Sequence, residues 1–254
     1  MSQRRTRIVG RLRSRKTRER EGLVLVEGVR ATEEALGAGA AIAFAVVAPG
    51  LLSTGAGADL LQRLHTHDVV EVGDAELAEL SDTQAPQGVL LVCEEPTSGL
   101  DTLSGRRFLV LDGIQDPGNA GSLVRGAVAF ALDGVVCLDG TVDPWGAKTV
   151  RASAGLIFRA AIWRASAGDC LERLGQLDVP LLVADASGGD AETRRGMARW
   201  ALAVGNEGAG VRGALRDAAA AVVSVPMKGP ADSLNAGVAG SILMHILSSG
   251  VAND

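Results

Sequence analysis

Polar residues that can do chemistry follow an apolar run in the stretch from Asp116 to Arg125. Residues 107–111 have the composition of a buried strand, and apolar residues at helical spacing recur over 123–131. In open α/β sheets such strand-to-helix turns carry ligand sites. The pattern predicts Asn119 as a helix cap, with Arg125 about one and a half turns into the helix. An ordinary turn has the same composition, so that alternative stays open here.

A second stretch combines an apolar run with a glycine-rich loop. Residues 200–204 predict a buried strand, and Gly205-Asn206-Glu207-Gly208 follows it directly. Glycines let backbone amides approach a ligand closely. The loop lacks the Gly-x-Gly-x-x-Gly spacing of dinucleotide sites, and no triphosphate-binding loop occurs in the chain.

A third stretch joins a predicted strand to a helix rich in glycine and alanine. The strand spans residues 222–225, and Met227 follows it closely. Asp232, Ser233 and Asn235 then precede the helix, where their side chains can cap it or face a ligand. Small residues within this helix indicate close backbone packing.

Charge is distributed unevenly along the chain of 254 residues, which has a formal net charge of −5. Residues 1–20 hold nine Arg or Lys and one Glu, a charge of +8, so the rest carries −13. A basic arm beside an acidic body is typical of polyanion binding. A solvated tail or a targeting sequence is the alternative.

Composition favours a globular cytoplasmic protein with one large or two small domains. The apolar segment Leu234–Leu247 is too short to span a bilayer, and no signal peptide is visible. The three cysteines, Cys93, Cys137 and Cys170, are far apart in the sequence. This favours reduced thiols in the core, and the spacing is not that of a metal site. His65-x-His67 lacks further ligands, so we expect no metal.

Alternating strands and helices predict an α/β chain with two domains. We expect a basic arm over 1–20, a small α/β domain over 21–95, a linker over 96–105 and a second domain over 106–254. Predicted strands of the first domain are 23–26, 42–47, 69–72 and 89–92, with helices at 29–36, 60–64 and 75–80. The second domain adds strands at 107–111, 135–138, 158–163, 181–184, 200–204 and 222–225, with helices at 123–131, 148–155, 171–177 and 234–247.

The three stretches together resemble the signatures of the SpoU family of RNA 2′-O-ribose methyltransferases, in the SPOUT superfamily. The matching elements are Asp-Pro-x-Asn-x-Gly-x-x-x-Arg, Gly-Asn-Glu-Gly and Pro-Met…Ser-Leu-Asn. Residues 148–155 are similar to a segment that lies between the first two signatures. Gly237, where the family often has Ser, and Ala131, where Gly is common, depart from the pattern. The first domain resembles the substrate-binding domain of larger SpoU enzymes, a fold shared with ribosomal proteins that bind RNA turns.

The resemblance implies a trefoil-knotted C-terminal domain, which topology rules would not predict, and a homodimer with its active site near the subunit interface. It implies methyl transfer from S-adenosylmethionine to a ribose 2′-hydroxyl. In having a separate N-terminal domain, the chain resembles the family members that act on ribosomal RNA more than those that act on transfer RNA. A non-catalytic RNA-binding protein, or an unrelated small-molecule enzyme, remains the alternative.

The resemblance also implies roles for individual residues. Arg125 is the catalytic candidate; the family proposal makes it a general base, but arginine stays protonated, which favours stabilisation of an alkoxide or orientation of a phosphate. Glu207 is the expected ion-pair partner of Arg125. Positioning residues are Asn119, Glu207, Ser233 and Asn235. Cofactor-binding residues are Val204, Gly205, Asn206, Gly208, Val225, Met227, Ser233 and Leu234. RNA-binding residues are Arg11, Arg13, Arg15, Lys16, Arg18 and Arg30.

Overall fold

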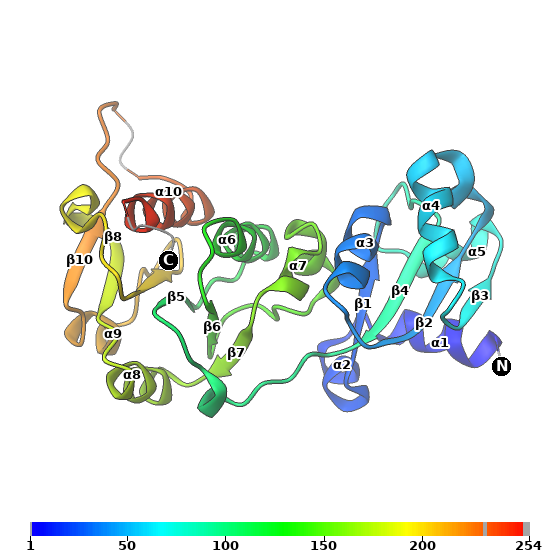
Figure 1. The fold of residues 1–254 in the computed structure, drawn as a ribbon, viewed down its shortest axis with the longest axis horizontal. Coiled ribbons are helices and arrows are strands. Elements are labelled where there is room, and N and C mark those ends of the chain that lie inside the picture. Colours follow the sequence, from blue (N-terminus) through cyan, green and yellow to red (C-terminus); the bar gives the residue numbers. More distant parts are fainter. Residues whose placement is uncertain (1, 231–232, 251–254) are drawn as a thin grey trace. The chain divides into compact units, whose positions relative to one another are not determined.

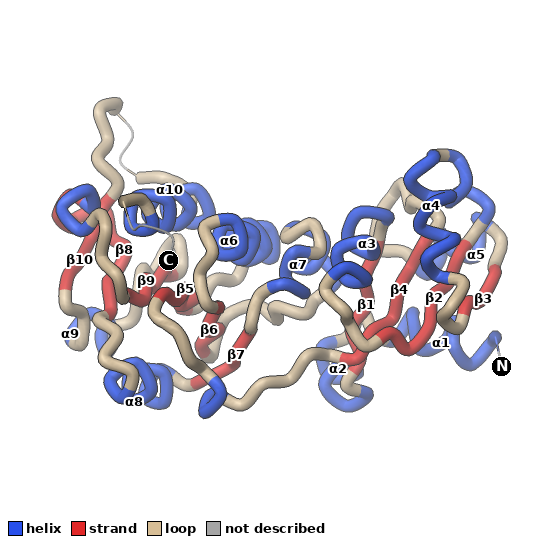
Figure 2. Tube along the Cα trace, in the orientation of Figure 1, coloured by secondary structure: helices blue, strands red, loops and turns tan. Residues whose placement is uncertain are grey.

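The computed structural model describes residues 2–230 and 233–250. Contacts divide the chain into two compact units, and Figure 1 and Figure 2 show the helices and strands of each. The first unit consists of residues up to Pro96 together with Trp145–Arg159. The second unit consists of Thr97–Pro144 and the chain from Ala160 onward.

A four-stranded sheet forms the centre of the first unit, in the order β1-β4-β2-β3. β4 pairs antiparallel with β1 and β2, and β3 pairs parallel with β2. The predicted strands and helices of residues 23–92 are confirmed with small changes at their ends. The strands are β1 (Leu23–Glu27), β2 (Ile42–Val47), β3 (Val69–Glu71) and β4 (Val89–Glu94), and the helices are α3 (Val29–Gly37), α4 (Gly55–Leu64) and α5 (Asp74–Leu80), with a short 3-10 helix η1 (Pro49–Ser53).

The basic N-terminal segment forms two helices of the first unit instead of a separate arm. These are α1 (Ser2–Arg11) and α2 (Arg15–Glu21). Val9 and Leu12 are fully buried in the same apolar core as Phe44 of β2. The predicted arm over 1–20 is therefore wrong as a structural unit, because apolar residues between the arginines anchor it to the sheet.

Residues 145–159 belong by contact to the first unit, although we expected them in the domain over 106–254. The segment contains α7 (Ala147–Ala152) and η3 (Leu156–Arg159). Arg151 Nη1 lies 2.9 Å from Glu27 Oε2, and Arg159 Nε lies 2.5 Å from Glu34 Oε2. The predicted strand 158–163 is wrong at its start, since residues up to Arg159 belong to η3 and the strand β7 spans Ile162–Ala165.

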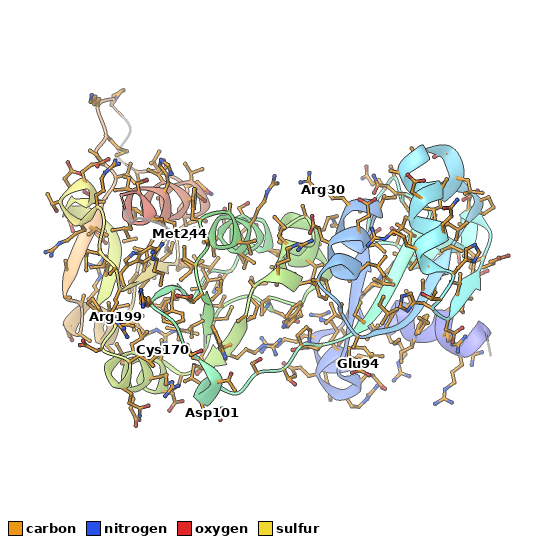
Figure 3. The ribbon with its side chains drawn as sticks, viewed as in Figure 1. Arg30, Glu94, Asp101, Cys170, Arg199 and Met244 are labelled. Atoms are coloured by element: carbon orange, nitrogen blue, oxygen red, sulfur yellow. The ribbon has the colours of Figure 1, made fainter. Side chains whose placement is uncertain are left out.

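The second unit contains a parallel six-stranded sheet in the order β10-β8-β9-β5-β6-β7. Helices α6 and α10 cover one face, and α8 covers the other (Figure 1). Met244 of α10 and Cys170 of α8, both labelled in Figure 3, are buried against the sheet. The strands are β5 (Arg107–Asp112), β6 (Gly134–Leu138), β7 (Ile162–Ala165), β8 (Leu181–Asp190), β9 (Trp200–Gly205) and β10 (Ala221–Ser224), and the helices are α6 (Pro117–Ala129), α8 (Ala167–Gln176), α9 (Gly213–Asp217) and α10 (Ala236–Ser248), with 3-10 helices η2 (Leu100–Thr102) and η4 (Ala191–Arg194).

Part of the predicted linker 96–105 is packed into the second unit. Leu103 is fully buried in the core beneath α8, and Thr102 accepts a hydrogen bond of 3.0 Å from Trp163 Nε1. With α6 and α10 on one face and α8 on the other, both faces of the sheet are covered, as is usual for parallel strands. The loops at the carboxyl ends of β5, β8, β9 and β10 are left to form a site.

Candidate active site

A cavity of about 600 Å³ opens over the carboxyl ends of β8, β9 and β10 and the start of α10. Its wall combines glycine backbone, aliphatic side chains and a few charged groups. The structure brings all the predicted cofactor-binding residues to this one cavity. They are Val204, Gly205, Asn206, Gly208, Val225, Met227, Ser233 and Leu234.

Three segments far apart in the sequence meet at the carboxylate of Glu207. Asn119 Nδ2, from the start of α6, donates to Glu207 Oε1. Asn235 Nδ2, from the start of α10, donates to the same oxygen over 3.2 Å. Each signature stretch therefore contributes one side chain to a single hydrogen-bonded group. We call these three residues the amide–carboxylate cluster.

The positions of Asn119 and Asn235 follow from helix capping. Asp116, and not the predicted Asn119, caps α6: its Oδ1 accepts from Asn119 N over 2.8 Å, with Pro117 in the first turn. This leaves the Asn119 side chain available to Glu207. Asn235 Oδ1 caps α10 by accepting from Val238 N over 3.2 Å.

Two further residues near the start of α10 were predicted to cap it or to face a ligand. Ser233 is exposed and lines the cavity, while Asp232, the other predicted cap, lies outside the described residues. A Cβ on Gly237 would lie 3.1 Å from the Oδ1 atoms of both Asn119 and Asn235. The departure from the family's Ser at Gly237 therefore lies directly beside the cluster.

Asn206 gives the glycine-rich loop its shape. Its Oδ1 accepts from the backbone N–H groups of Gly208 and Ala209, over 2.9 and 3.1 Å. Its Nδ2 donates to Gly113 O over 3.1 Å, which ties the loop to the end of β5. A Cβ on Gly205 would lie 2.3 Å from the backbone of Gly210, so only glycine fits there.

An ion pair between buried Asp112 and partly exposed Arg212 holds the far end of the same loop. Asp112 ends β5 and is 3% exposed. Arg212 donates to it from its backbone N over 2.7 Å and from Nε over 2.6 Å, and its Nη2 donates to Asp139 O. Hydrogen bonds at both ends fix the loop before any ligand binds, because neither anchor depends on one.

Arg125 lies exposed on α6. The predicted ion pair with Glu207 is not formed in this structure: among residues 2–230 and 233–250, Arg125 makes no hydrogen bond or ion pair, and Glu207 Oε1 accepts from two amides. The guanidinium is thus available to a group outside the described chain.

Asp185 and Arg216 also line the cavity and were missed by the sequence reasoning. Asp185 Oδ1 accepts from the hydroxyl of Ser187 over 2.6 Å and from its backbone N over 2.9 Å, and Oδ2 pairs with Arg216 Nη2. The hydrogen bonds from Ser187, followed by the bond and charge of Arg216, hold the pKa of Asp185 below its ordinary value. The signal was present, since Asp185 directly follows the predicted strand 181–184.

The predicted RNA-binding arginines include one that is part of the fold. Arg18 is 5% exposed and donates to the backbone oxygens of Leu12 and Arg13, over 2.7 and 2.9 Å. This burial removes Arg18 from the predicted contacts with RNA. Arg13 Nε pairs with Asp82 over 2.9 Å, and Arg15 pairs with Glu19 over 2.7 Å.

The remaining predicted RNA-binding residues, Arg11, Lys16 and Arg30, are exposed. Figure 3 labels Arg30 on α3. Arg4 and Arg7 share one face of α1 with Arg11, because they lie at helical spacing opposite the buried Val9. Within the part of the chain that the structure describes, none of these three arginines forms an ion pair, whereas Arg5, also on α1, pairs with Asp68. We call Arg4, Arg7 and Arg11 the basic stripe.

Comparisons with known proteins agree over both units. Residues 106–245 match the SpoU rRNA Methylase family, and residues 4–91 match the MRM3-like substrate binding domain. The chain is 33% identical over 245 residues to the 23S rRNA (guanosine(2553)-2′-O)-methyltransferase RlmP of Bacillus subtilis (strain 168), covering 93% of each protein. The chain belongs to the SpoU rRNA methylase family.

Solved structures resemble the whole chain as well. The SpoU methyltransferase AviRb from Streptomyces viridochromogenes, in complex with the cofactor AdoMet, is 27% identical with a TM-score of 0.86, covering 96% of both chains. An AdoMet-bound rRNA methyltransferase from Sinorhizobium meliloti is 28% identical with a TM-score of 0.82, over 95% of this chain and 93% of that one. Among the described residues, no helix has the length and apolar composition needed to cross a membrane.

Proposed function

We propose that this protein transfers a methyl group from S-adenosylmethionine to a ribose 2′-hydroxyl of ribosomal RNA. The observation that carries the proposal is the convergence of Asn119, Glu207 and Asn235 at the edge of one cavity. The relative RlmP is named for this reaction on 23S rRNA, and AviRb for AdoMet binding within the same family.

The cavity suits S-adenosylmethionine in size and in chemistry. Its volume of about 600 Å³ is within the range of small-molecule sites. Val204, Val223 and Leu243 offer apolar surface, while the backbone of Gly205 and Gly208 offers polar groups at close range. When bound, the cofactor supplies a methyl group that its sulfonium already activates. The protein's own task is therefore to bind, orient and stabilise charge.

Glu207 holds the cluster and receives the substrate. Both amides donate to Oε1, and among the described residues Oε2 accepts no hydrogen bond. Oε2 is therefore available to a ribose hydroxyl. Because the cluster is fixed by helix caps and loop anchors, it holds that hydroxyl in one orientation.

Arg125 stabilises the alkoxide that develops as the 2′-hydroxyl loses its proton to solvent, or it orients the adjacent phosphate. Arginine side chains carry a strongly held proton in proteins in general, so a guanidinium is a poor candidate for the general base that the family proposal makes of this residue. It is exposed and lacks a partner in the described chain, as expected for a group that meets the substrate. Arginine suits this role because its planar fork donates to two oxygens at once.

RNA is bound by the first unit in this proposal. The basic stripe together with Lys16 and Arg30 presents exposed cations to phosphates. The match to an MRM3-like substrate binding domain supports this division of labour. Ribosomal RNA is favoured over transfer RNA because two relatives are named for activity on 23S rRNA. They are RlmP and the 23S rRNA (uridine(2479)-2′-O)-methyltransferase of Streptomyces viridochromogenes, which is 31% identical over 198 residues.

Assembly and location complete the proposal. A homodimer is supported by exposed apolar side chains at the cavity and on α10: Met227 is 39%, Leu234 36% and Val238 48% exposed. The trefoil knot stays a prediction from the family resemblance. A cytoplasmic location rests on three free, buried cysteine thiols.

The test combines cofactor binding with methyl transfer. Calorimetry with S-adenosylhomocysteine measures binding, and label from S-adenosylmethionine is followed into ribosomal and transfer RNA separately. We expect binding and label in ribosomal RNA alone. Binding of RNA without binding of S-adenosylhomocysteine would favour a non-catalytic RNA-binding protein, and label in transfer RNA would contradict the substrate assignment.

A further inference from the structure

Two charged residues line the cavity outside the amide–carboxylate cluster. Asp185 follows the buried part of β8, and Arg216 lies on α9. In the sheet, β8 lies on the opposite side of β9 from β5, and β5 leads into α6, whose first turn contains Asn119. The Asp185–Arg216 pair is therefore on the side of the cavity away from the segment that provides Asn119.

Both side chains are held in place from several directions. Asp185 Oδ1 accepts two hydrogen bonds from Ser187, and Oδ2 pairs with Arg216. Arg216 Nε also donates to Val211 O over 3.2 Å, which connects the pair to the end of the glycine-rich loop. The side chains nevertheless remain 23% and 36% exposed, so the cavity reaches them.

The chemistry of this pair matches vicinal hydroxyl groups. The carboxylate offers acceptor lone pairs and the guanidinium offers N–H donors, while the pair as a whole carries no net charge. A hydroxyl both donates and accepts, so two neighbouring hydroxyls satisfy both members. An ammonium group is matched less well, because its charge would require an unpaired carboxylate.

We propose that Asp185 and Arg216 bind the ribose hydroxyls of the adenosine portion of the methyl donor. This assignment rests on the proposed function, since it requires the cavity to be the cofactor site. It adds two positioning residues on the side of the cavity away from Asn119. It also gives the cavity an orientation, with the ribose at β8 and α9.

The experiment measures ligand affinity by calorimetry with two adenosine compounds. S-Adenosylhomocysteine carries the amino-acid tail, whereas 5′-methylthioadenosine has the same ribose and no tail. We expect Asp185→Asn to weaken both ligands by a similar factor of about 10, the size associated with a hydrogen bond to a charged group. Asp217→Asn, an exposed neighbour of Arg216 on α9, is the matched control and should leave both affinities within about twofold.

A second measurement removes the hydroxyls instead of the carboxylate. Wild-type protein should bind 2′,3′-dideoxy-5′-methylthioadenosine about 10-fold more weakly than the parent compound, and Asp185→Asn should abolish most of that difference. The wild-type comparison holds even where the variant folds poorly. Thermal unfolding of each variant accompanies the titrations.

The outcomes separate the two proposals. Unchanged affinities in Asp185→Asn, or equal binding of the parent and dideoxy compounds by wild type, would overturn the ribose assignment while leaving the cofactor site intact. A loss confined to S-adenosylhomocysteine would also overturn it, because the carboxylate would then bind the ammonium of the tail. Failure of wild type to bind S-adenosylhomocysteine would overturn the proposed function itself.

Discussion

Charged and polar side chains are used differently in the N-terminal helices and in the cavity loops. In α2, Arg18 is buried, and its Nη1 donates to the backbone oxygens of Leu12 and Arg13, in the turn between α1 and α2. At the cavity, Glu207 and Arg125 are exposed, and Glu207 receives amides from segments about 90 and 30 residues away in the chain. One arrangement completes a fold, and the other leaves capacity for a ligand.

The difference indicates how to separate structural from functional polar groups in this chain. A buried charge whose partners are close in sequence stabilises its own element. An exposed polar group that is fixed by distant segments is ordered in advance for a ligand, which lowers the cost of binding. The predictions below vary one member of each class, beginning with the largest expected effect.

Replacement of Gly205 should abolish cofactor binding. In Gly205→Ala the new Cβ would lie 2.3 Å from the backbone of Gly210, so the loop has to move. We expect the affinity for S-adenosylhomocysteine to fall more than about 100-fold, as for backbone displacement at a close approach. Gly208→Ala is the control, because its Cβ would meet Asn206 at 3.5 Å, an ordinary contact. Equal behaviour of the two variants in calorimetry would contradict the loop's role.

Removal of the Glu207 carboxylate should slow methyl transfer by about 100-fold at saturating cofactor. Glu207→Ala leaves the Asn119 and Asn235 amides without their shared acceptor. Glu207→Gln retains an acceptor oxygen, so it should keep more activity than the alanine variant. Initial rates with ribosomal RNA measure both, and a fully active Glu207→Ala would break the link between the cluster and the reaction.

Alanine variants of Arg18 and Lys16 should differ in their free energy of unfolding, because Arg18 is buried in the fold and Lys16 is exposed. Arg18→Ala leaves two carbonyl oxygens unpaired and a gap in the fold, so we expect the free energy of unfolding to fall by about 2 kcal/mol. Lys16→Ala changes an exposed side chain, and its unfolding free energy should stay within about 0.5 kcal/mol of wild type. Denaturant titration measures both, and equal stabilities would show that Arg18 is not structural.

The basic stripe should affect the salt dependence of RNA binding. Replacement of Arg4, Arg7 and Arg11 by alanine removes three exposed cations. If each contacts one phosphate, the slope of log affinity against log salt should decrease by about 2, with a loss of about 10-fold near physiological salt. Filter binding over a salt series tests this. Replacement of Arg15 and Arg20, which form ion pairs on α2, is the control and should change the slope less.

The smallest expected effect concerns pH. Because the folded-state pKa of Asp185 is lowered, its ionised form favours the folded state. The resulting stability is present above the unfolded-state pKa and is lost as the pH falls through the lower folded-state pKa. The difference in thermal stability between wild type and Asp185→Asn should therefore stay constant from pH 8 to 6, at under about 1 kcal/mol, and shrink only in acid. A change near pH 7 would indicate another titrating group.

Much of the fold and of the site could be predicted from the polar residues that follow apolar runs in the sequence. Asn119 and Glu207 follow strands that proved to be neighbours, β5 and β9, and parallel strands end at the same edge. The pattern did not specify that Glu207 would bind two amides instead of Arg125, because hydrogen-bond partners depend on side-chain positions in three dimensions. Asp185 also directly follows a predicted strand, 181–184, but it was not predicted as a site residue.

The sequence was a poorer guide to which charged residues are buried and to how the chain divides into units. The run of arginines predicted an arm, but Val9 and Leu12 within it form core contacts that a charge count ignores. Residues 145–159 were assigned by order along the chain, whereas the contacts of Arg151 with Glu27 assign them to the first unit. Both errors arose where long-range packing outweighed local composition.

The central claim is tested most directly by the chemical product. Ribosomal RNA treated with wild-type protein and labelled S-adenosylmethionine would be digested to nucleosides and analysed by mass spectrometry, beside Arg125→Ala and Arg125→Lys. The account predicts one 2′-O-methylated nucleoside with wild type, and a loss of about 100-fold or more in both variants while S-adenosylhomocysteine affinity is kept. A methylated base in place of a methylated ribose, or full activity of Arg125→Ala, would contradict it.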